Sequence, residues 1–168
     1  MKKTFLKHLG LFVIVAFVGI IINSCGDDTT TNNNTTPTYD AKSINGTVNF
    51  VETNFLDSSS GSYLIAAYPE SGWPPMGGPT AFATIPVVNG TAAYNYKLTD
   101  LADGNYVISV GFRKNTGGQS PIMGIYGCDT SHSVSCLLNP TLKATITNSE
   151  GVGNITFMSW ADTTNKIY

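Results

Sequence analysis

The residues with the clearest chemical potential in this 168-residue chain are Cys128, His132 and Cys136, spaced as C-x₃-H-x₃-C. On a helix this spacing would put all three side chains on one face, where a structural zinc ion could bind with Asp129 as a fourth ligand. The serine and threonine residues between them are poor helix formers. In an exported protein the two cysteines favour a disulfide, with free thiols or a metal site as alternatives.

Histidine catalysis has little support. His8 is the only other histidine and lies in a segment that we expect to be removed. A hydrolase needs a base beside its nucleophile, and Ser131 and Ser133 neighbour His132 only in sequence. The G-x-S-x-G signature of hydrolases is absent. We therefore predict a protein that is not an enzyme and has no cofactor, with an exported hydrolase or metal-binding protein centred on His132 as an alternative.

A second candidate is the acidic cluster in "YKLTDLADGNYVISV", residues 96 to 110. An EF-hand loop needs oxygen ligands at alternate positions and a closing glutamate. Asp100 and Asp103 are three residues apart, with the apolar Leu101 between them and no closing acid. Gly104 suits a turn position with positive φ, and Asp103 can close an Asx turn. The cluster is interpreted as a corner between two strands.

The N-terminus determines where such chemistry would take place. Lys2, Lys3 and Lys7 precede an apolar run from Leu9 to Ile22. As a helix these residues would extend about 21 Å, short of the roughly 30 Å hydrocarbon core of a bilayer. A basic start followed by a short apolar segment is typical of a signal peptide, here residues 1–24.

The sequence "INSC", ending at Cys25, resembles the lipobox of bacterial lipoproteins. The resemblance implies cleavage before Cys25 and attachment of several acyl chains there, enough for stable membrane anchoring. The alternative is an ordinary secretory signal. "CGDD" also resembles the acidic export signals of surface lipoproteins of the Bacteroidetes group. We therefore expect a lipid anchor in the bacterial outer membrane and display on the cell surface, with the periplasmic face as the alternative.

The charge balance narrows the range of partners. The formal net charge is −2, and removing residues 1–24 would leave six cationic and eleven acidic residues, a net charge of −5. Such a chain is poorly suited to nucleic acid. Residues 26–40 have no apolar residue before Tyr39, so we predict a flexible tether that follows Cys25.

Residues 41–168 form one predicted β domain. Short runs of period two are separated by Gly, Pro, Asn and Asp, and no sustained helical period occurs. We expect a single antiparallel β-sandwich of about seven strands, near 43–51, 62–69, 80–86, 91–98, 105–113, 141–147 and 153–160. The runs 62–69 and 80–86 are so apolar that both faces are expected to be covered.

The opening strand "INGTVNF" and the corner formed by Leu101, Gly104 and Tyr106 resemble the carboxypeptidase regulatory-like and transthyretin-like β-sandwich domains. Those families have an I-x-G-x-V strand and a leucine–x–x–glycine–x–tyrosine corner. The resemblance implies an accessory, adhesive or scaffold module. The chain departs from the pattern after residue 113, where a long loop replaces a short turn.

Two loops are candidate contact surfaces. The first, residues 69–79, contains Trp73, Pro74, Pro75 and Met76, and its prolines would reduce the entropy lost on binding. Trp73 is interpreted either as a contact residue or as a plug over one end of the sandwich. The second loop, 114–127, combines glycines with apolar residues.

The predicted function is therefore that of a non-enzymatic, envelope-anchored lipoprotein. Its β-sandwich would act as a binding or structural module for a protein or glycan partner. An accessory subunit of a surface carbohydrate-uptake or secretion assembly is a further alternative, because partner subunits could then supply the chemistry that this chain lacks.

Overall fold

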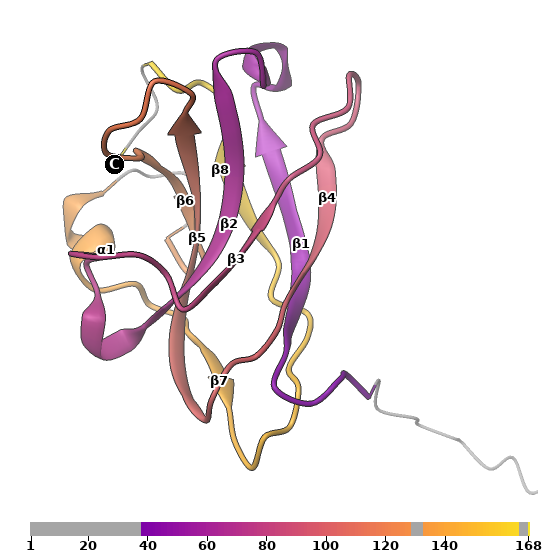
Figure 1. The fold of residues 1–168 in the computed structure, drawn as a ribbon, viewed down its shortest axis with the longest axis vertical. Coiled ribbons are helices and arrows are strands. Elements are labelled where there is room, and N and C mark those ends of the chain that lie inside the picture. The colour runs from indigo at the N-terminus through magenta and orange to yellow at the C-terminus, as the bar shows by residue number, and fades with distance from the viewer. Residues whose placement is uncertain (1–37, 129–132, 165–167) are drawn as a thin grey trace, which may run out of the picture. The chain divides into compact units, whose positions relative to one another are not determined.

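The computed structural model describes residues 38–128, 133–164 and 168, which belong to one compact unit, Thr35–Tyr168. Figure 1 shows the all-β sandwich predicted from the sequence. Three short helices interrupt it: η1 (Thr53–Phe55), η2 (Glu70–Gly72) and α1 (Val134–Leu138). The strands are β1 (Ile44–Val51), β2 (Gly61–Pro69), β3 (Ala81–Thr84), β4 (Ala93–Leu98), β5 (Gly104–Lys114), β6 (Ile122–Ile125), β7 (Ala144–Ile146) and β8 (Phe157–Trp160).

The strands form two sheets with one main core between them. The first sheet has the order β4-β1-β8, and the second has the order β3-β2-β5-β6, with β7 paired to β5. The sheets also approach each other along their sides, where β6 lies beside β8 and β3 lies beside β4. The period-two runs noted in the sequence bury one set of alternate residues in each of three strands: Ile44, Val48 and Phe50; Tyr94, Tyr96 and Leu98; Tyr106, Ile108, Val110 and Phe112.

Two features of the topology differ from the prediction. Strand β6 lies inside the segment expected to be a long loop, because the long β5 offers a free edge with which even a short run can pair. The pairing of β1 with β8 is parallel rather than antiparallel. The chain returns alongside β1 after β7, and an isolated parallel bridge between Ile44 and Val152 starts this pairing.

The glycine of "INGTVNF" has a packing role. A Cβ atom at Gly46 would lie 1.9 Å from the carbonyl oxygen of Ile155, so the two backbones could not approach as they do. The same space admits the Tyr96 hydroxyl, which donates a 2.7 Å hydrogen bond to that oxygen. Burial raises the pKa of the Tyr96 phenol, which therefore remains a donor.

The acidic cluster forms the corner inferred from the sequence. Leu101 is fully buried, Gly104 has φ of 152°, and the Tyr106 hydroxyl donates to the Ala102 carbonyl at 2.9 Å. Asp103 accepts a 2.7 Å hydrogen bond from the backbone N–H of Ser149. This carboxylate ties the corner to the turn after β7 instead of closing its own turn, a long-range contact that local sequence could not indicate.

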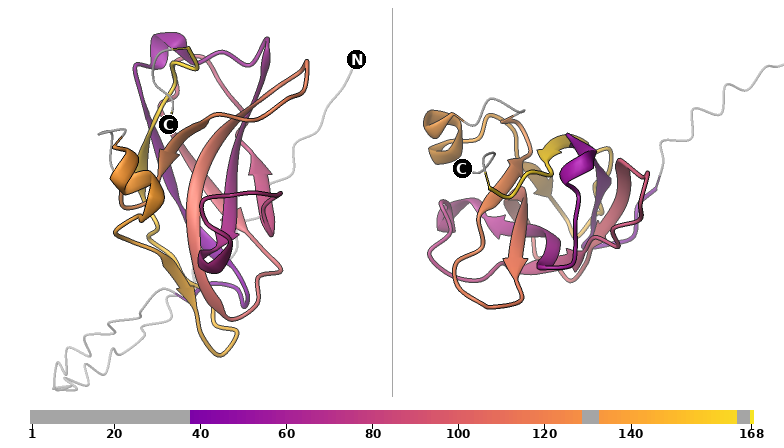
Figure 2. Two further views of the ribbon diagram at one scale, coloured as in Figure 1. Left: turned by 90° about the vertical axis from the view of Figure 1, so that its left-hand side faces the viewer. Right: turned by 90° about the horizontal axis from the view of Figure 1, so that it is seen from above.

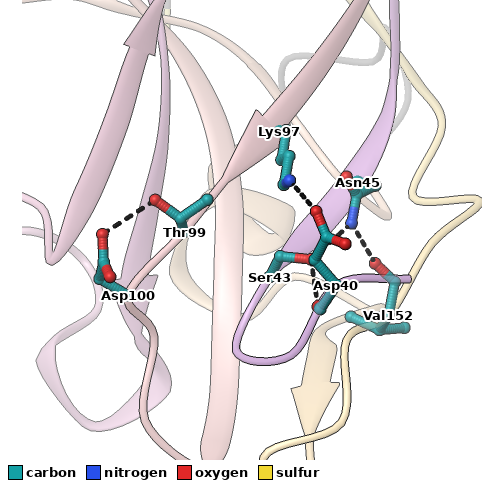
Figure 3. Close-up of polar contacts among 7 residues, drawn as sticks. All are labelled: Asp40, Ser43, Asn45, Lys97, Thr99, Asp100 and Val152. Atoms are coloured by element: carbon teal, nitrogen blue, oxygen red, sulfur yellow. Dashed lines mark hydrogen bonds and ion pairs between the residues drawn. The ribbon is translucent and has the colours of Figure 1, made fainter.

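A polar cluster fixes the start of β1 (Figure 3). The Ser43 hydroxyl donates to the Asp40 carbonyl at 2.6 Å, and the Asn45 amide donates to Ser43 at 2.8 Å. Asp40 also forms an ion pair with Lys97 of β4, and the Lys97 hydrogen bond holds the pKa of the Asp40 carboxyl below its usual value. Tyr39 packs over Gly153. Packing against the sandwich thus includes the last two residues of the segment predicted to be a tether.

Candidate binding groove

A second, smaller apolar cluster covers part of the outer face of the second sheet. Val107 and Ile125 lie on this face, and with Cys128 they are buried beneath partly buried side chains that include Trp73 and Leu137. These covering residues come from the loop after β2 and from α1. Seen from above in Figure 2, α1 and η2 lie on the side of the second sheet that faces away from β1 and β4.

Trp73 joins the proline-rich loop to α1. Its indole N–H donates a 2.6 Å hydrogen bond to the Leu137 carbonyl oxygen, and its ring lies 5.5 Å from the Tyr68 ring in an edge-to-face arrangement. Trp73 is partly buried. It covers the outer face of a sheet rather than one end of the sandwich. Of the four residues proposed for this loop, Trp73 packs inward, whereas Pro74, Pro75 and Met76 line a groove described below.

Cys128 and Cys136 form a disulfide in the structure, with their Cα atoms 5.5 Å apart. Their sulfur atoms are bonded to each other and are therefore not thiolate ligands in this state. His132 and Asp129, the other ligands of the zinc alternative, lie outside the described residues, as do Cys25 and the segment before it. Among the described residues, no three His, Cys, Asp or Glu side chains are grouped as a metal site would require.

Loss of this disulfide should destabilise the domain without unfolding it. The bridge closes a loop of about nine residues, and its loop-closure entropy is worth about 2.5 kcal/mol. The main core lies elsewhere and should hold the fold together. We expect the double variant Cys128→Ala and Cys136→Ala to melt about 8–10 °C below the wild type. Calorimetry would measure this difference.

Two comparisons control for the loss of the side chains themselves. Wild-type protein treated with a reductant should melt at the same lower temperature as the double variant. Alkylation before and after reduction, followed by mass spectrometry, reports the state of the thiols. Two freely alkylated cysteines in protein isolated under oxidising conditions would contradict the bridge.

An open groove of about 900 Å³ lies on the outer face of the second sheet. Its floor comes from side chains of β2 and β5, where Leu64 is paired with Gly111 and Ala66 with Ser109. Phe82 of β3, 58% exposed, is the neighbour of Ala66 on this face. Ala66, Ser109 and Gly111 are small and form the middle of the floor, and the larger Phe82 lies at its side. The groove is therefore open along its floor.

The groove is bounded by both loops that the sequence singled out. Residues 74–79, after η2, border one part of it, and residues 118–121, between β5 and β6, border another. Figure 1 shows the two connections at different heights along β2 and β5. Of the apolar residues in the second loop, Met123 and Ile125 are buried in β6, whereas Ile122 is partly buried and lines the groove. The loop's part of the groove includes Gly118, Gln119, Ser120 and Pro121.

The charged residues of the groove are cationic. Arg113 and Lys114, at the end of β5, line it, and among the described residues no Asp or Glu side chain does. Glu70, at the start of the first loop, does not line the groove and pairs with Lys143 at 3.0 Å. Hydrogen bonds from Lys143 and Asn105 hold the pKa of the Glu70 carboxyl below its usual value. Within the described part of the chain, neither Arg113 nor Lys114 has an ion-pair partner.

The two loops singled out from the sequence did not include the strand residues of this groove, among them Phe82, Ser109 and Arg113. The sequence "YVISVGFRK" did contain a clue. Its alternate residues Val107, Ser109, Gly111 and Arg113 must face the side of the strand opposite to the core residues. These residues read as an ordinary solvated face of a strand. Only the fold shows that loops border that face.

No family model matches the chain, and no curated protein or solved structure is significantly similar to it. The resemblance to lipoproteins and to carboxypeptidase regulatory-like domains therefore stays a prediction made from short motifs. Among the described residues no helix is long and apolar enough to cross a membrane.

Proposed function

We propose that this protein is a lipid-anchored binding module of the bacterial envelope that holds a partner in the groove on its second sheet. It does no chemistry on that partner. Cys25, after the signal segment, attaches the chain to the outer membrane, and the residues between Cys25 and Tyr39 space the sandwich away from it. The proposal of an anchor rests on the basic start, the short apolar run and the "INSC" sequence.

One observation supports binding most directly. Two loops from opposite ends of β2 and β5 border the same groove, over a floor that exposes few large side chains. Exposed apolar residues lie at this groove, notably Phe82 and Met76, which is 99% exposed. An exposed aromatic residue beside a shallow groove is a typical contact residue for a partner. A role as an accessory subunit of a surface assembly would use the same groove.

The binding function can be tested by screening for ligands that depend on Phe82. The full chain, purified in detergent, would be tested against a panel of purified polysaccharides and immobilised envelope proteins. We expect at least one ligand whose affinity falls about tenfold in Phe82→Ala, the loss typical of an aromatic contact residue.

Val88→Ala is the matched control. Val88 is 57% exposed, almost the same as Phe82, but does not line the groove. Its substitution should leave the affinity unchanged. Ligands that bind equally well to all three proteins would place the binding surface elsewhere, and a panel without any ligand would contradict the binding function.

A further inference from the structure

The floor of the groove offers a ligand side chains but no free strand edge. Strand β2 is paired with β3 on one side and β5 on the other, and β5 is paired with β2 and with β6 or β7. The backbone N–H and C=O groups of both strands are therefore used within the sheet. An extended peptide that adds to a sheet needs a free strand edge, which this floor does not offer.

The side chains on the floor and sides suit a ligand with flat faces and many hydroxyl groups. Phe82 and Tyr68 supply aromatic surface, and Gln119 and Ser120 supply amide and hydroxyl groups. Burial raises the pKa of the Tyr68 phenol, so this group keeps its proton. The floor between them is made of the small residues Ala66, Ser109 and Gly111.

Ser109 places a polar group on the floor of the groove. This residue is only 2% exposed, yet it lines the groove and its hydroxyl has no hydrogen-bond partner among the described residues. A buried hydroxyl without a partner is costly, and native structures rarely leave one unsatisfied. A ligand hydroxyl above Ser109 would satisfy it.

The charge of the groove defines the ligand further. Ser109, Gly111 and Arg113 lie on one face of β5. The Cα atom of Arg113, which carries the guanidinium group, is therefore about 13 Å along the strand from that of Ser109. A guanidinium group binds a carboxylate through two parallel hydrogen bonds. Lys114 adds a second positive charge, and no Asp or Glu side chain of the described residues lines the groove to oppose an anionic ligand.

From these contacts we infer that the groove binds an acidic polysaccharide whose sugar carboxylates pair with Arg113 while its ring faces pack on Phe82. This inference rests on the proposed binding function and adds the ligand class. The hydroxyl of Ser109 forms a hydrogen bond with a sugar hydroxyl near the middle of the groove.

The test compares polymers that differ in charge or in backbone. The full chain in detergent would be run by native electrophoresis through gels that contain polygalacturonate, alginate, fully methyl-esterified polygalacturonate or poly-L-glutamate. We expect a uronate polymer, polygalacturonate or alginate, to retard the protein. The methyl ester and poly-L-glutamate should each retard it at least tenfold more weakly. Retardation should decrease as salt is added, because the pairing is partly exposed.

Three variants locate the interaction. Arg113→Gln should weaken binding of the uronate polymer about tenfold, as expected for loss of a charge-assisted pair. Lys42→Gln removes the same charge outside the groove and should have no effect. Ser109→Ala should fold with undiminished stability, because its hydroxyl has no partner in the protein, but should bind the polymer several-fold more weakly.

Each other outcome overturns the inference in a distinct way. Equal retardation by poly-L-glutamate would indicate an acidic peptide or a general polyanion site. Retardation by the methyl ester that depends on Phe82 and not on Arg113 would support the binding function but refute the carboxylate pairing. If no polymer retards the protein, the ligand class is wrong, and the panel with Phe82→Ala decides the binding function independently.

Discussion

Trp73→Ala is expected to lower the free energy of unfolding by about 3 kcal/mol, the lower part of the range for truncating a packed aromatic residue. The indole ring packs against Tyr68 and covers the small apolar cluster around Val107. Its loss would also leave the Leu137 carbonyl without the 2.6 Å hydrogen bond that connects the two segments. Urea denaturation of the full chain in detergent measures this quantity.

Two further variants separate the contributions of the Trp73 side chain. Trp73→Phe keeps an aromatic ring against Tyr68 and removes the N–H donor, so it should cost about 1 kcal/mol. Met76→Ala, in the same loop, should change stability by less than about 0.5 kcal/mol because that side chain is almost fully exposed. A Trp73→Ala protein as stable as the wild type would show that the ring is free to contact a partner.

This result also bears on the groove. Trp73 does not line it, but the adjacent Pro74, Pro75 and Met76 do. By joining the loop to α1, Trp73 holds one border of the groove in place. The tryptophan and the prolines that follow it, which the sequence presented as one contact surface, thus have separate roles: the first packs, and the others face the groove.

The parts of the fold that the sequence predicted well are those where one face of a strand meets the core. The residues Tyr106, Ile108, Val110 and Phe112 alternate without interruption, and a one-residue shift would expose all of them. The corner around Leu101 and Gly104 was equally readable, because positive φ and a buried apolar residue leave local signals. Register and turn chemistry are local properties and can be read from local sequence.

The errors arose where tertiary context outweighs local pattern. Strand β3 was expected to be covered on both faces, but it lies at the edge of its sheet and leaves Phe82 exposed. Strand β6 has only four residues, one of them glycine, and forms because β5 supplies the pairing edge. The groove depends on which outer face the two loops border, and no periodicity within one strand carries that information.

Cys25→Ala should abolish attachment of fatty acid to this protein. Lipoprotein acylation needs the cysteine sulfur, which alanine lacks, and the other two cysteines are paired with each other as Cys128 and Cys136. Metabolic labelling of cells with a fatty acid, followed by isolation of the protein, measures incorporation directly. We expect strong labelling of the wild type and none of the variant, with the variant held as an uncleaved precursor.

The double variant Cys128→Ala and Cys136→Ala is the matched control, since it removes two cysteines and keeps Cys25. It should be labelled as strongly as the wild type and remain in the membrane fraction. A Cys25→Ala protein that still carries label would refute acylation at this residue. An unlabelled wild type that is exported in soluble form would instead identify the N-terminal segment as an ordinary secretory signal. The groove would then act in a free protein, because its side chains and borders all lie within the sandwich and do not depend on the anchor.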